Sequence, residues 1–253
     1  MSEIKVIKIG GKVIQSEAKL DQFLHDFEKT GGKKILVHGG GNLASEIADQ
    51  LGVQSKMVSG RRITDAKMLE VATMTYAGLV NKKIVAKLQA LRCNALGLTG
   101  ADLDLIRSVK RSSNPIDFGM VGDIQYVNSE ILIQLLNMGI TPVVAPLTHN
   151  GKDQLLNTNA DNVASYIACS LVNHSIVSLD LCLDLQGVLN GDELVTEMNL
   201  LLYRYLKGMG KITNGMIPKV DLGFKALNEG VINVRILGFD TFKNKKAGTR
   251  IVK

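Results

Sequence analysis

The sequence predicts an α/β protein, a three-layer αβα sandwich in which helices cover both faces of a mainly parallel sheet. Short apolar runs alternate with amphipathic stretches along the chain, and this alternation is typical of βαβ units. Glycine-rich turns follow two of the early apolar runs. No internal repeat or Pro/Ser-rich linker divides the 253 residues. We therefore expect one domain, residues 1–253, whose two lobes (about 1–150 and 151–253) share one continuous sheet.

The first elements follow a strand, turn, helix order. Ile4 to Ile9 is an apolar run that predicts a strand, and it ends in Gly10-Gly11. A helix is expected over about Glu17 to Thr30. A second buried strand is predicted over Lys34 to His38, and a second glycine turn, Gly39-Gly40-Gly41, follows it directly.

The next segments are expected to be helical. Asn42 belongs to a residue type that caps helices, and apolar residues at helical spacing follow it. The longest helical pattern opens at Thr64-Asp65 and extends to about Leu91, with apolar residues on more than one face. Such a helix is expected to pack against a partner subunit as well as against its own sheet. Ala95 to Leu98 is then a predicted strand.

The second half of the chain repeats the theme. Gly119 to Gly122 lies between short β-like pieces and indicates an irregular hairpin. The periodicity predicts two helices, over about 162–172 and 219–229. It also predicts four buried or closing strands, over 140–146, 175–181, 231–237 and 250–252.

Composition excludes several classes of protein. The hydrophobic fraction is 45% and the charged fraction 21%, as in an ordinary globular enzyme. The three cysteines, Cys93, Cys169 and Cys182, are far apart and form no CxxC pair or Cys/His cluster. This spacing argues against a disulfide framework and against structural zinc, so we expect reduced thiols and no protein-built metal site.

Charge and hydropathy bear on partners and location. The net charge is +6, but the basic residues are scattered apart from Lys243, Lys245 and Lys246, and no aromatic residues interleave with them. We therefore expect no nucleic-acid partner. No secretory signal is apparent, and no apolar run approaches the ~20 residues that span a bilayer. A cytoplasmic protein without membrane contact is expected.

The two glycine turns are suited to anions. Glycine lets the backbone approach a ligand closely, and the N–H groups at the start of a following helix favour negative charge. A glycine turn of this kind can equally be only a tight turn. The chain lacks a GxxxxGK[ST] loop, a GxGxxG fingerprint after a strand and the protein-kinase motifs. If the chain binds a nucleotide, it therefore does so through a motif other than these.

Charged and polar residues accompany these turns. Lys8 lies just before Gly10-Gly11, at the edge where open parallel sheets bind their ligands. Lys219 begins a helix, where a cation is unfavourable unless an anion lies beside it. Between them, Asn157-Thr-Asn-Ala-Asp161 leads into an apolar helix. One residue of this segment is expected to cap that helix, and the others to belong to a site.

Five motifs, in this order, resemble those of the acylglutamate kinase branch of the amino-acid kinase family over essentially the whole chain. They are Lys8-Ile-Gly-Gly11, His38-Gly-Gly-Gly41, Gly60-Arg-Arg-Ile-Thr-Asp65, Asn157-Thr-Asn-Ala-Asp161 and Gly215-Met-Ile-Pro-Lys219. The first two are shared with carbamate kinases, aspartokinases and uridylate kinases, whereas the third and fourth are more specific to the acylglutamate branch. The resemblance implies ATP-dependent phosphorylation of the γ-carboxylate of N-acetyl-L-glutamate, or of a close analogue such as N-succinyl-L-glutamate, in arginine biosynthesis. ATP and Mg²⁺ are the implied cofactors.

The resemblance also implies roles for single residues. The N-terminal lobe would bind the acylated amino acid and the C-terminal lobe ATP. The implied catalytic residues are Lys8 and Lys219, which contact the transferring phosphoryl group, and Asp161, which holds both lysines. The implied substrate ligands are Arg62 and Asn157, which grip the α-carboxylate, with Gly40 and Gly41. The implied ATP and phosphate ligands are Gly10, Gly11, Gly40, Asp184, Gly187 and Gly215.

The chain departs from the family at two places. The nucleotide-side turn reads Leu183-Asp-Leu-Gln-Gly-Val188 where the family usually has Thr-Asp-x-Pro-Gly-Val. Arg61 stands where the family commonly has an apolar residue. It is either a surface charge or a contact for a substrate with one more carboxylate, such as N-succinylglutamate.

Other readings remain open. The acceptor can instead be carbamate, aspartate or a nucleoside monophosphate, or the chain can be a non-catalytic nucleotide or amino-acid sensor. A carboxylate acceptor needs no general base, since it is already ionised at pH 7, and this agrees with a site without an obvious catalytic histidine. His38 is interpreted as a strand-end residue. Members of this family that arginine inhibits carry an extra N-terminal helix that joins dimers into hexamers, and only a few residues precede the first strand here. The resemblance therefore implies a homodimer, built partly on the helix over 65–91, that is insensitive to arginine.

Overall fold

The fold is described from a computed structural model, which describes residues 3–58, 61–212 and 215–253. Gly60, the first residue of the third motif, lies outside the described residues. Within the described ranges, no helix is both long and apolar enough to cross a membrane.

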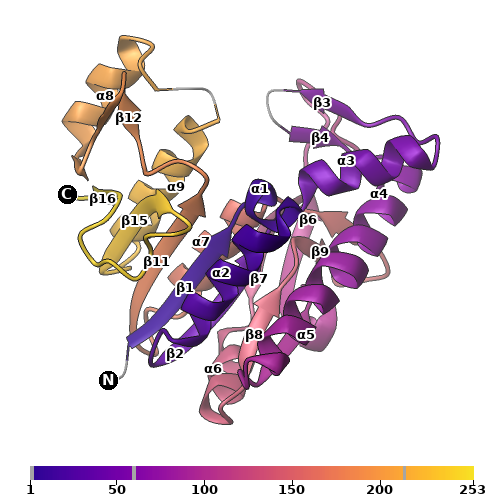
Figure 1. Ribbon diagram of the computed structural model, residues 1–253. Coiled ribbons are helices and arrows are strands. Elements are labelled where there is room, and N and C mark those ends of the chain that lie inside the picture. The colour runs from indigo at the N-terminus through magenta and orange to yellow at the C-terminus, as the bar shows by residue number, and fades with distance from the viewer. Residues whose placement is uncertain (1–2, 59–60, 213–214) are drawn as a thin grey trace.

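One eight-stranded sheet runs through both halves of the chain (Figure 1). Its strands lie in the order β14-β16-β15-β11-β1-β2-β8-β5, and all neighbours pair in parallel except β15 with β16. The bounds, in that order, are Glu197–Met198, Thr249–Ile251, Asn233–Gly238, Ile176–Leu183, Glu3–Ile9, Lys33–His38, Thr141–Val144 and Ala95–Leu98. The predicted mainly parallel sheet is confirmed.

The central strand β1 is buried on both faces because helices cover the sheet on both sides. Ile4 and Val6 pack into one apolar core, and Ile7 and Ile9 into a second core on the opposite face. This division follows from the alternation of side chains along a strand. The near-continuous apolar run therefore serves two cores at once.

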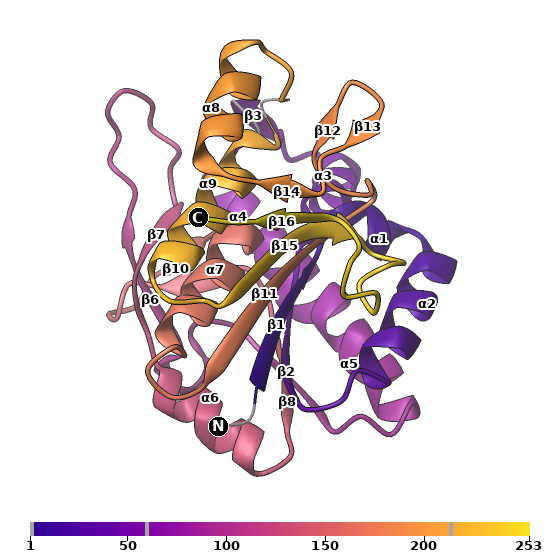
Figure 2. The same ribbon diagram turned by 90° about the vertical axis from the view of Figure 1, so that its left-hand side faces the viewer.

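The helices form two layers, one on each face of the sheet (Figure 2). On one face lie α6 (Ser129–Asn137), α7 (Ala160–Ser170) and α9 (Ile217–Asn228). On the other face lie α2 (Glu17–Glu28) and α5 (Asn81–Ala90). The three-layer αβα sandwich is thus confirmed.

The predicted long helix is a continuous rod whose middle differs from expectation. Asp65 caps α4 (Ala66–Thr73) by accepting from the backbone N–H of Met68 at 2.8 Å. A π-helix, η1 (Met74–Val80), then leads directly into α5. Hydrophobic periodicity does not reveal such a segment, because a π-helix changes the hydrogen-bond register and leaves the residue types ordinary.

Smaller elements frame the site. A second sheet, in the order β10-β9-β6-β7, contains the predicted irregular hairpin as β6 and β7. Its strands, with the hairpins β3–β4 and β12–β13, have the bounds β6 Ile106–Lys110, β7 Gly122–Val127, β9 Leu147–His149, β10 Leu155–Asn157, β3 Lys56–Val58, β4 Arg61–Ile63, β12 Leu189–Asn190 and β13 Glu193–Leu194. The remaining helices are α1 Gly11–Gln15, α3 Gly41–Gln50, η2 Asp102–Asp104 and α8 Leu200–Gly208.

The predicted cap at Asn42 is wrong. The N-cap of α3 is Gly40, two residues earlier than predicted, and no side chain caps the helix. Asn42 instead donates from its side chain to Gln15 Oε1 at 3.1 Å. The first N–H groups of α3 are consequently left to face the pocket described below.

Candidate active site

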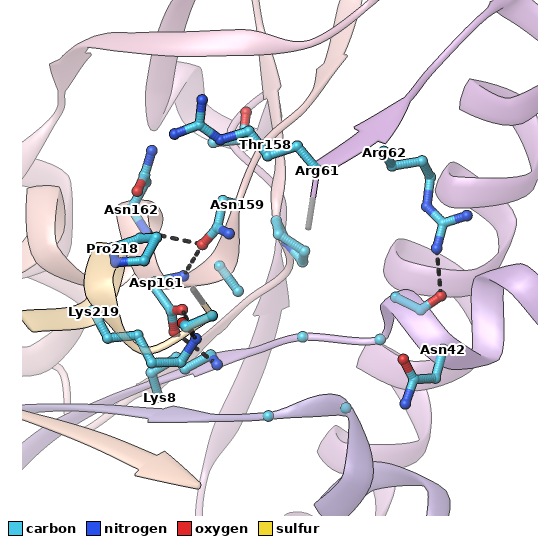
Figure 3. A pocket seen from close by; sticks show the side chains of 18 of the residues that line it. Lys8, Asn42, Arg61, Arg62, Thr158, Asn159, Asp161, Asn162, Pro218 and Lys219 are labelled. Atoms are coloured by element: carbon cyan, nitrogen blue, oxygen red, sulfur yellow. Dashed lines mark hydrogen bonds and ion pairs between the residues drawn. The ribbon is translucent and has the colours of Figure 1, made fainter. Parts of the chain in front are cut away.

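A pocket of about 610 Å³ lies at the carboxyl ends of β1, β2 and β11, where open parallel sheets bind ligands. Residues from both halves of the chain line it: the two glycine turns and β4 on one side, and the starts of α7 and α9 on the other. Figure 3 shows the charged and polar side chains that surround it. Its size suits a small-molecule ligand.

Three charged residues meet at the bottom of the pocket (Figure 3). Lys8, near the end of β1, lies with Nζ 2.7 Å from Asp161 Oδ1. Lys219, in the first turn of α9, lies with Nζ 2.9 Å from Asp161 Oδ2. The side chains of Lys8 and Asp161 are 8% and 6% exposed. The predicted convergence of two lysines on one aspartate is therefore present in the geometry.

Asp161 remains ionised in this setting. Burial acts to raise the pKa of its carboxyl group, but the two ammonium groups outweigh burial and lower the pKa to about 2. The helix that carries it is capped by Asn159, whose Oδ1 accepts from the backbone N–H of Asp161 at 2.7 Å. The expected cap within this motif is confirmed, and it fixes Asp161 on the second residue of α7.

The two glycine turns lie side by side in one wall of the pocket. A side chain at Gly11 would lie within 3.9 Å of the backbone nitrogens of Gly40, Gly41 and Asn42. At Gly40 a Cβ would approach the ring of Tyr76 to 2.9 Å, so only glycine fits there. The turns thus bring backbone N–H groups together in one wall of the pocket, where they suit an anion.

Behind the second turn, His38 anchors the backbone. It is fully buried, and burial lowers its pKa to about 4, so the ring is neutral at pH 7. Its Nδ1 lies 2.8 Å from the carbonyl oxygen of Gly39, and its Nε2 lies 3.1 Å from Asn81 Nδ2. Since the carbonyl can only accept, the proton is on Nδ1 and Nε2 accepts from Asn81. His38 ends β2, as predicted.

Arg62 and Asn157 both line the pocket, with part of their hydrogen-bonding capacity used by the protein. Arg62 donates to the carbonyl oxygen of Gly41 at 2.7 Å and to Ser45 Oγ at 2.8 Å. Asn157 donates from Nδ2 to Thr64 Oγ1 at 3.0 Å. The structure thus brings both residues to the cavity, and their contact with a substrate carboxylate stays a prediction.

The nucleotide-side residues are only partly brought together. Gly10, Asp184 and Gly215 line the pocket. Gly187 is not among the described lining residues; it packs against Thr249, where a Cβ would approach Oγ1 to 2.8 Å. This glycine lets the turn after β11 pack closely on β16.

The pocket is strongly cationic. Its described lining contains six side-chain cations, Lys8, Lys12, Arg61, Arg62, Arg111 and Lys219, and two carboxylates, Asp161 and Asp184. Such a lining attracts anionic ligands and raises their local concentration. In the part of the chain that the structure describes, no three His, Cys, Asp or Glu residues are grouped to hold a metal ion.

Two of these cations were not anticipated as site residues. Lys12 follows Gly11 directly, and its position beside a predicted phosphate turn was the available signal. Arg111 comes from the loop after β6, its Nε 3.0 Å from Asp123 Oδ1 and its guanidinium 5.6 Å from the centre of the Phe118 ring. Nothing in the local sequence places that loop at the pocket, because its position depends on the fold of the second sheet.

The chain resembles known proteins over its full length. The model of the amino acid kinase family matches residues 3–238. Acetylglutamate kinase of Cytophaga hutchinsonii is 48% identical over 100% of this chain and 99% of its own length. Acetylglutamate kinase of Bacteroides thetaiotaomicron is 48% identical over 99% of both chains.

A solved structure shares the architecture. The crystal structure of smu.665 from Streptococcus mutans UA159 is 27% identical, covers 98% of each chain and superposes with a TM-score of 0.82. The αβα layers and the order of the strands are therefore a recurring arrangement.

Proposed function

This chain belongs to the amino acid kinase family, and from that membership we propose that it phosphorylates the γ-carboxylate of N-acetyl-L-glutamate, or of a close N-acyl analogue, in arginine biosynthesis, with ATP as donor. The observation that carries the proposal is the geometry of Lys8, Asp161 and Lys219 at the base of a cationic pocket.

The reaction needs charge neutralisation more than proton transfer. A γ-carboxylate is already an anion at pH 7, so it attacks the γ-phosphorus without a general base. Neutral His38, sealed behind the glycine turn, is not required as one. An anion must, however, approach a polyphosphate, and fixed cations and N–H groups lower that barrier.

The described residues can divide this work among them. Lys8 and Lys219 would contact the transferring phosphoryl group, and Asp161 holds both ammonium groups in place before the ligand arrives. Gly11, Gly40 and Gly41 would offer N–H groups to the phosphates. We assign Arg62 and Asn157 to the α-carboxylate, the N-terminal lobe to the acylated amino acid and the C-terminal lobe to ATP.

The donor set of the pocket also fits Mg²⁺ carried by the nucleotide. This ion is usually held by one or two carboxylates together with substrate phosphates and water. Asp161 is buried between two lysines, whereas Asp184 is paired with one exposed lysine, Lys12, so Asp184 is the described lining carboxylate that would turn to the ion. When bound, Mg²⁺ would neutralise charge on the β- and γ-phosphates.

Arg61 favours a second possibility for the acyl group. Its side chain is exposed, lines the pocket, and makes no ion pair with the described residues. Figure 3 shows it pointing to the opposite side from Arg62, toward Thr158. A guanidinium there is placed for a further carboxylate, as in N-succinyl-L-glutamate. Equal acetyl-to-succinyl preference in the wild type and Arg61→Leu would remove this possibility.

The test is ADP release with Mg-ATP on N-acetylglutamate, N-succinylglutamate and free glutamate side by side, with Lys8→Ala as the blank. Turnover on an acylated substrate, absent with Lys8→Ala, is expected. No turnover on any of the three would contradict the proposal and favour another acceptor or a nucleotide sensor.

Two further features belong to the proposal. We infer a homodimer built partly on the rod α4–η1–α5, because Met74 and Leu79 on η1 are 54% and 51% exposed although they are large and apolar. We also place the enzyme in the cytoplasm, and arginine insensitivity stays a prediction.

A further inference from the structure

A third lysine, Lys12, lines the pocket but is not part of the cluster around Asp161. Lys12 follows Gly11 directly, and its Nζ lies 2.7 Å from Asp184 Oδ2. The side chains of Lys12 and Asp184 are 68% and 30% exposed, and both line the pocket. The pair therefore sits at the ligand-accessible surface of the cavity.

The topology explains why these two residues meet. β1 and β11 are neighbouring parallel strands, with Ile9 opposite Cys182 at their ends. The segments that leave the two strands emerge at the same edge of the sheet. Lys12 comes three residues after Ile9, and Asp184 two residues after Cys182. The ion pair thus links the two halves of the chain at the part of the pocket where the phosphates are proposed to bind.

The pair is inexpensive to break. An ion pair between exposed side chains contributes about 0–1 kcal/mol, since water and salt screen both charges. Asp184 gains from it: burial acts to raise the pKa of its carboxyl group, but the hydrogen bond from Lys12, a backbone hydrogen bond and the charges of Lys12 and Lys19 together lower it. Lys12 itself has a flexible four-carbon stem, so its ammonium group can reach another anion without movement of the backbone.

A bound polyphosphate is the stronger partner. It carries several negative charges and many acceptor oxygens, whereas Asp184 offers one charge, so the attraction of an ammonium group to the polyphosphate is the greater. When Lys12 leaves Asp184, the Mg²⁺ carried by the nucleotide would take its place beside that carboxylate. We propose that Lys12 is a third phosphate-binding lysine, which rests on Asp184 in the empty pocket and moves to the terminal phosphates of the bound nucleotide. This inference rests on the proposed use of ATP.

The contact would be made to the bound nucleotide and to the transition state alike. Lys12→Ala should therefore weaken binding of a non-hydrolysable ATP analogue by about 3- to 10-fold, as expected for one charged hydrogen bond at an exposed site. The KM for ATP should rise by a similar factor with kcat changed less than about 2-fold. Adenosine binding should not change, and Lys12→Arg should retain most of the affinity.

The experiment is titration calorimetry of wild type, Lys12→Ala, Asp184→Asn and the double variant with the Mg²⁺-loaded analogue and with adenosine. If Lys12 binds phosphate itself, Lys12→Ala still weakens analogue binding in the Asp184→Asn background. If Lys12 acts only by holding Asp184, its removal has no effect in that background, and this result overturns the inference. Lys83→Ala is the matched control, because Lys83 is an exposed lysine paired with Glu17 on the distant helices α5 and α2.

The outcomes separate this inference from the proposed function. A wild-type protein that binds no nucleotide contradicts the use of ATP. If Lys12→Ala binds the analogue as tightly as the wild type does, the role of Lys12 is contradicted, and the kinase proposal is unaffected.

Discussion

Asp161 is a counterion shared by two lysines, and its protonation state decides whether they stay in place. Its folded-state pKa of about 2 lies below the usual 3.8. The stabilisation from this group is therefore fully present above about pH 4 and is lost as the pH falls toward 2. The lysine pair is thus held throughout the range in which an enzyme of this kind works.

Loss of either lysine should act on the chemical step. Lys8→Ala or Lys219→Ala removes a cation from the place where charge develops, and we expect kcat to fall about 10²- to 10³-fold. The measurement is steady-state ADP release at saturating substrates, with Lys83→Ala as the control. A variant at either position that keeps kcat within 10-fold of the wild type would contradict the assigned role.

His38 should make folding stability depend on pH. Its pKa is lowered from 6.5 to about 4 by burial, so the unfolded chain takes up the proton first as the pH falls. Stability from this group is complete above pH 6.5 and declines between pH 6.5 and 4, by on the order of 3 kcal/mol. Urea unfolding of the wild type and His38→Asn across this range measures the difference.

The comparison has a built-in reference. The reference variant is His25→Asn, which removes a histidine whose side chain is 53% exposed. A His38→Asn protein with the same acid sensitivity as the wild type would show that burial of this ring does not govern the transition.

At the scale of elements, the rod α4–η1–α5 supports the second glycine turn. Asn81 begins α5 directly after the π-helix and is buried, and its Nδ2 lies 2.9 Å from the carbonyl oxygen of Val143 and 3.1 Å from His38 Nε2. The π-helix thus ends, and the α-helical hydrogen-bond pattern resumes, at Asn81. Among the described residues, Asn81 alone contacts both His38 and the carbonyl oxygen of Val143.

Asn81→Ala should therefore destabilise the protein by about 1–3 kcal/mol, because a carbonyl oxygen and a ring nitrogen lose their donor in a buried site. On the same rod, Gly78→Ala should be neutral or stabilising by about 0.5–1 kcal/mol, since its added Cβ meets no described atom within 4 Å beyond its chain neighbours and the backbone of its own helix. Chemical unfolding of both variants tests the contrast. Equal stability of the two would contradict a supporting role for Asn81.

Sequence patterns predict the regular elements better than the connections between them. The strand β1 and the rod over 65–91 follow from periodicity, since apolar spacing alone specifies which side chains are buried. The motif residues Lys8, Asp161 and Lys219 could be anticipated as neighbours through a resemblance. The place of Arg111 at the pocket could not be anticipated, because it depends on a contact between segments distant in sequence. The cap at Gly40 could not be anticipated either, because α3 begins without a side-chain cap.

At the scale of the whole molecule, the exposed apolar residues fall on separate surfaces. Met74 and Leu79 lie on η1, while Leu201, 80% exposed, lies on α8 at the other end of the sheet (Figure 1). If two copies pair through the rod, Leu79→Glu buries an unpaired charge at the interface and should dissociate the dimer. Light scattering after gel filtration gives the mass.

The matched variant is Leu201→Glu, which should remain dimeric. A protein that is monomeric without any substitution, or that dissociates with Leu201→Glu and not with Leu79→Glu, would contradict pairing through the rod.

The position of β1 in the sheet has a consequence for how the protein is made. The central strand β1 is synthesised well before β11, one of its two neighbours, and Glu3 of β1 lies opposite Ile176 of β11. At about 5–20 residues per second, the ribosome needs roughly 10–35 s to deliver that neighbour. During this interval the nascent chain presents a strand edge of unpaired N–H and C=O groups flanked by apolar side chains, a template for pairing with other chains. At high expression levels, the yield of folded protein should therefore depend strongly on the supply of chaperones, even if the folded enzyme itself is stable.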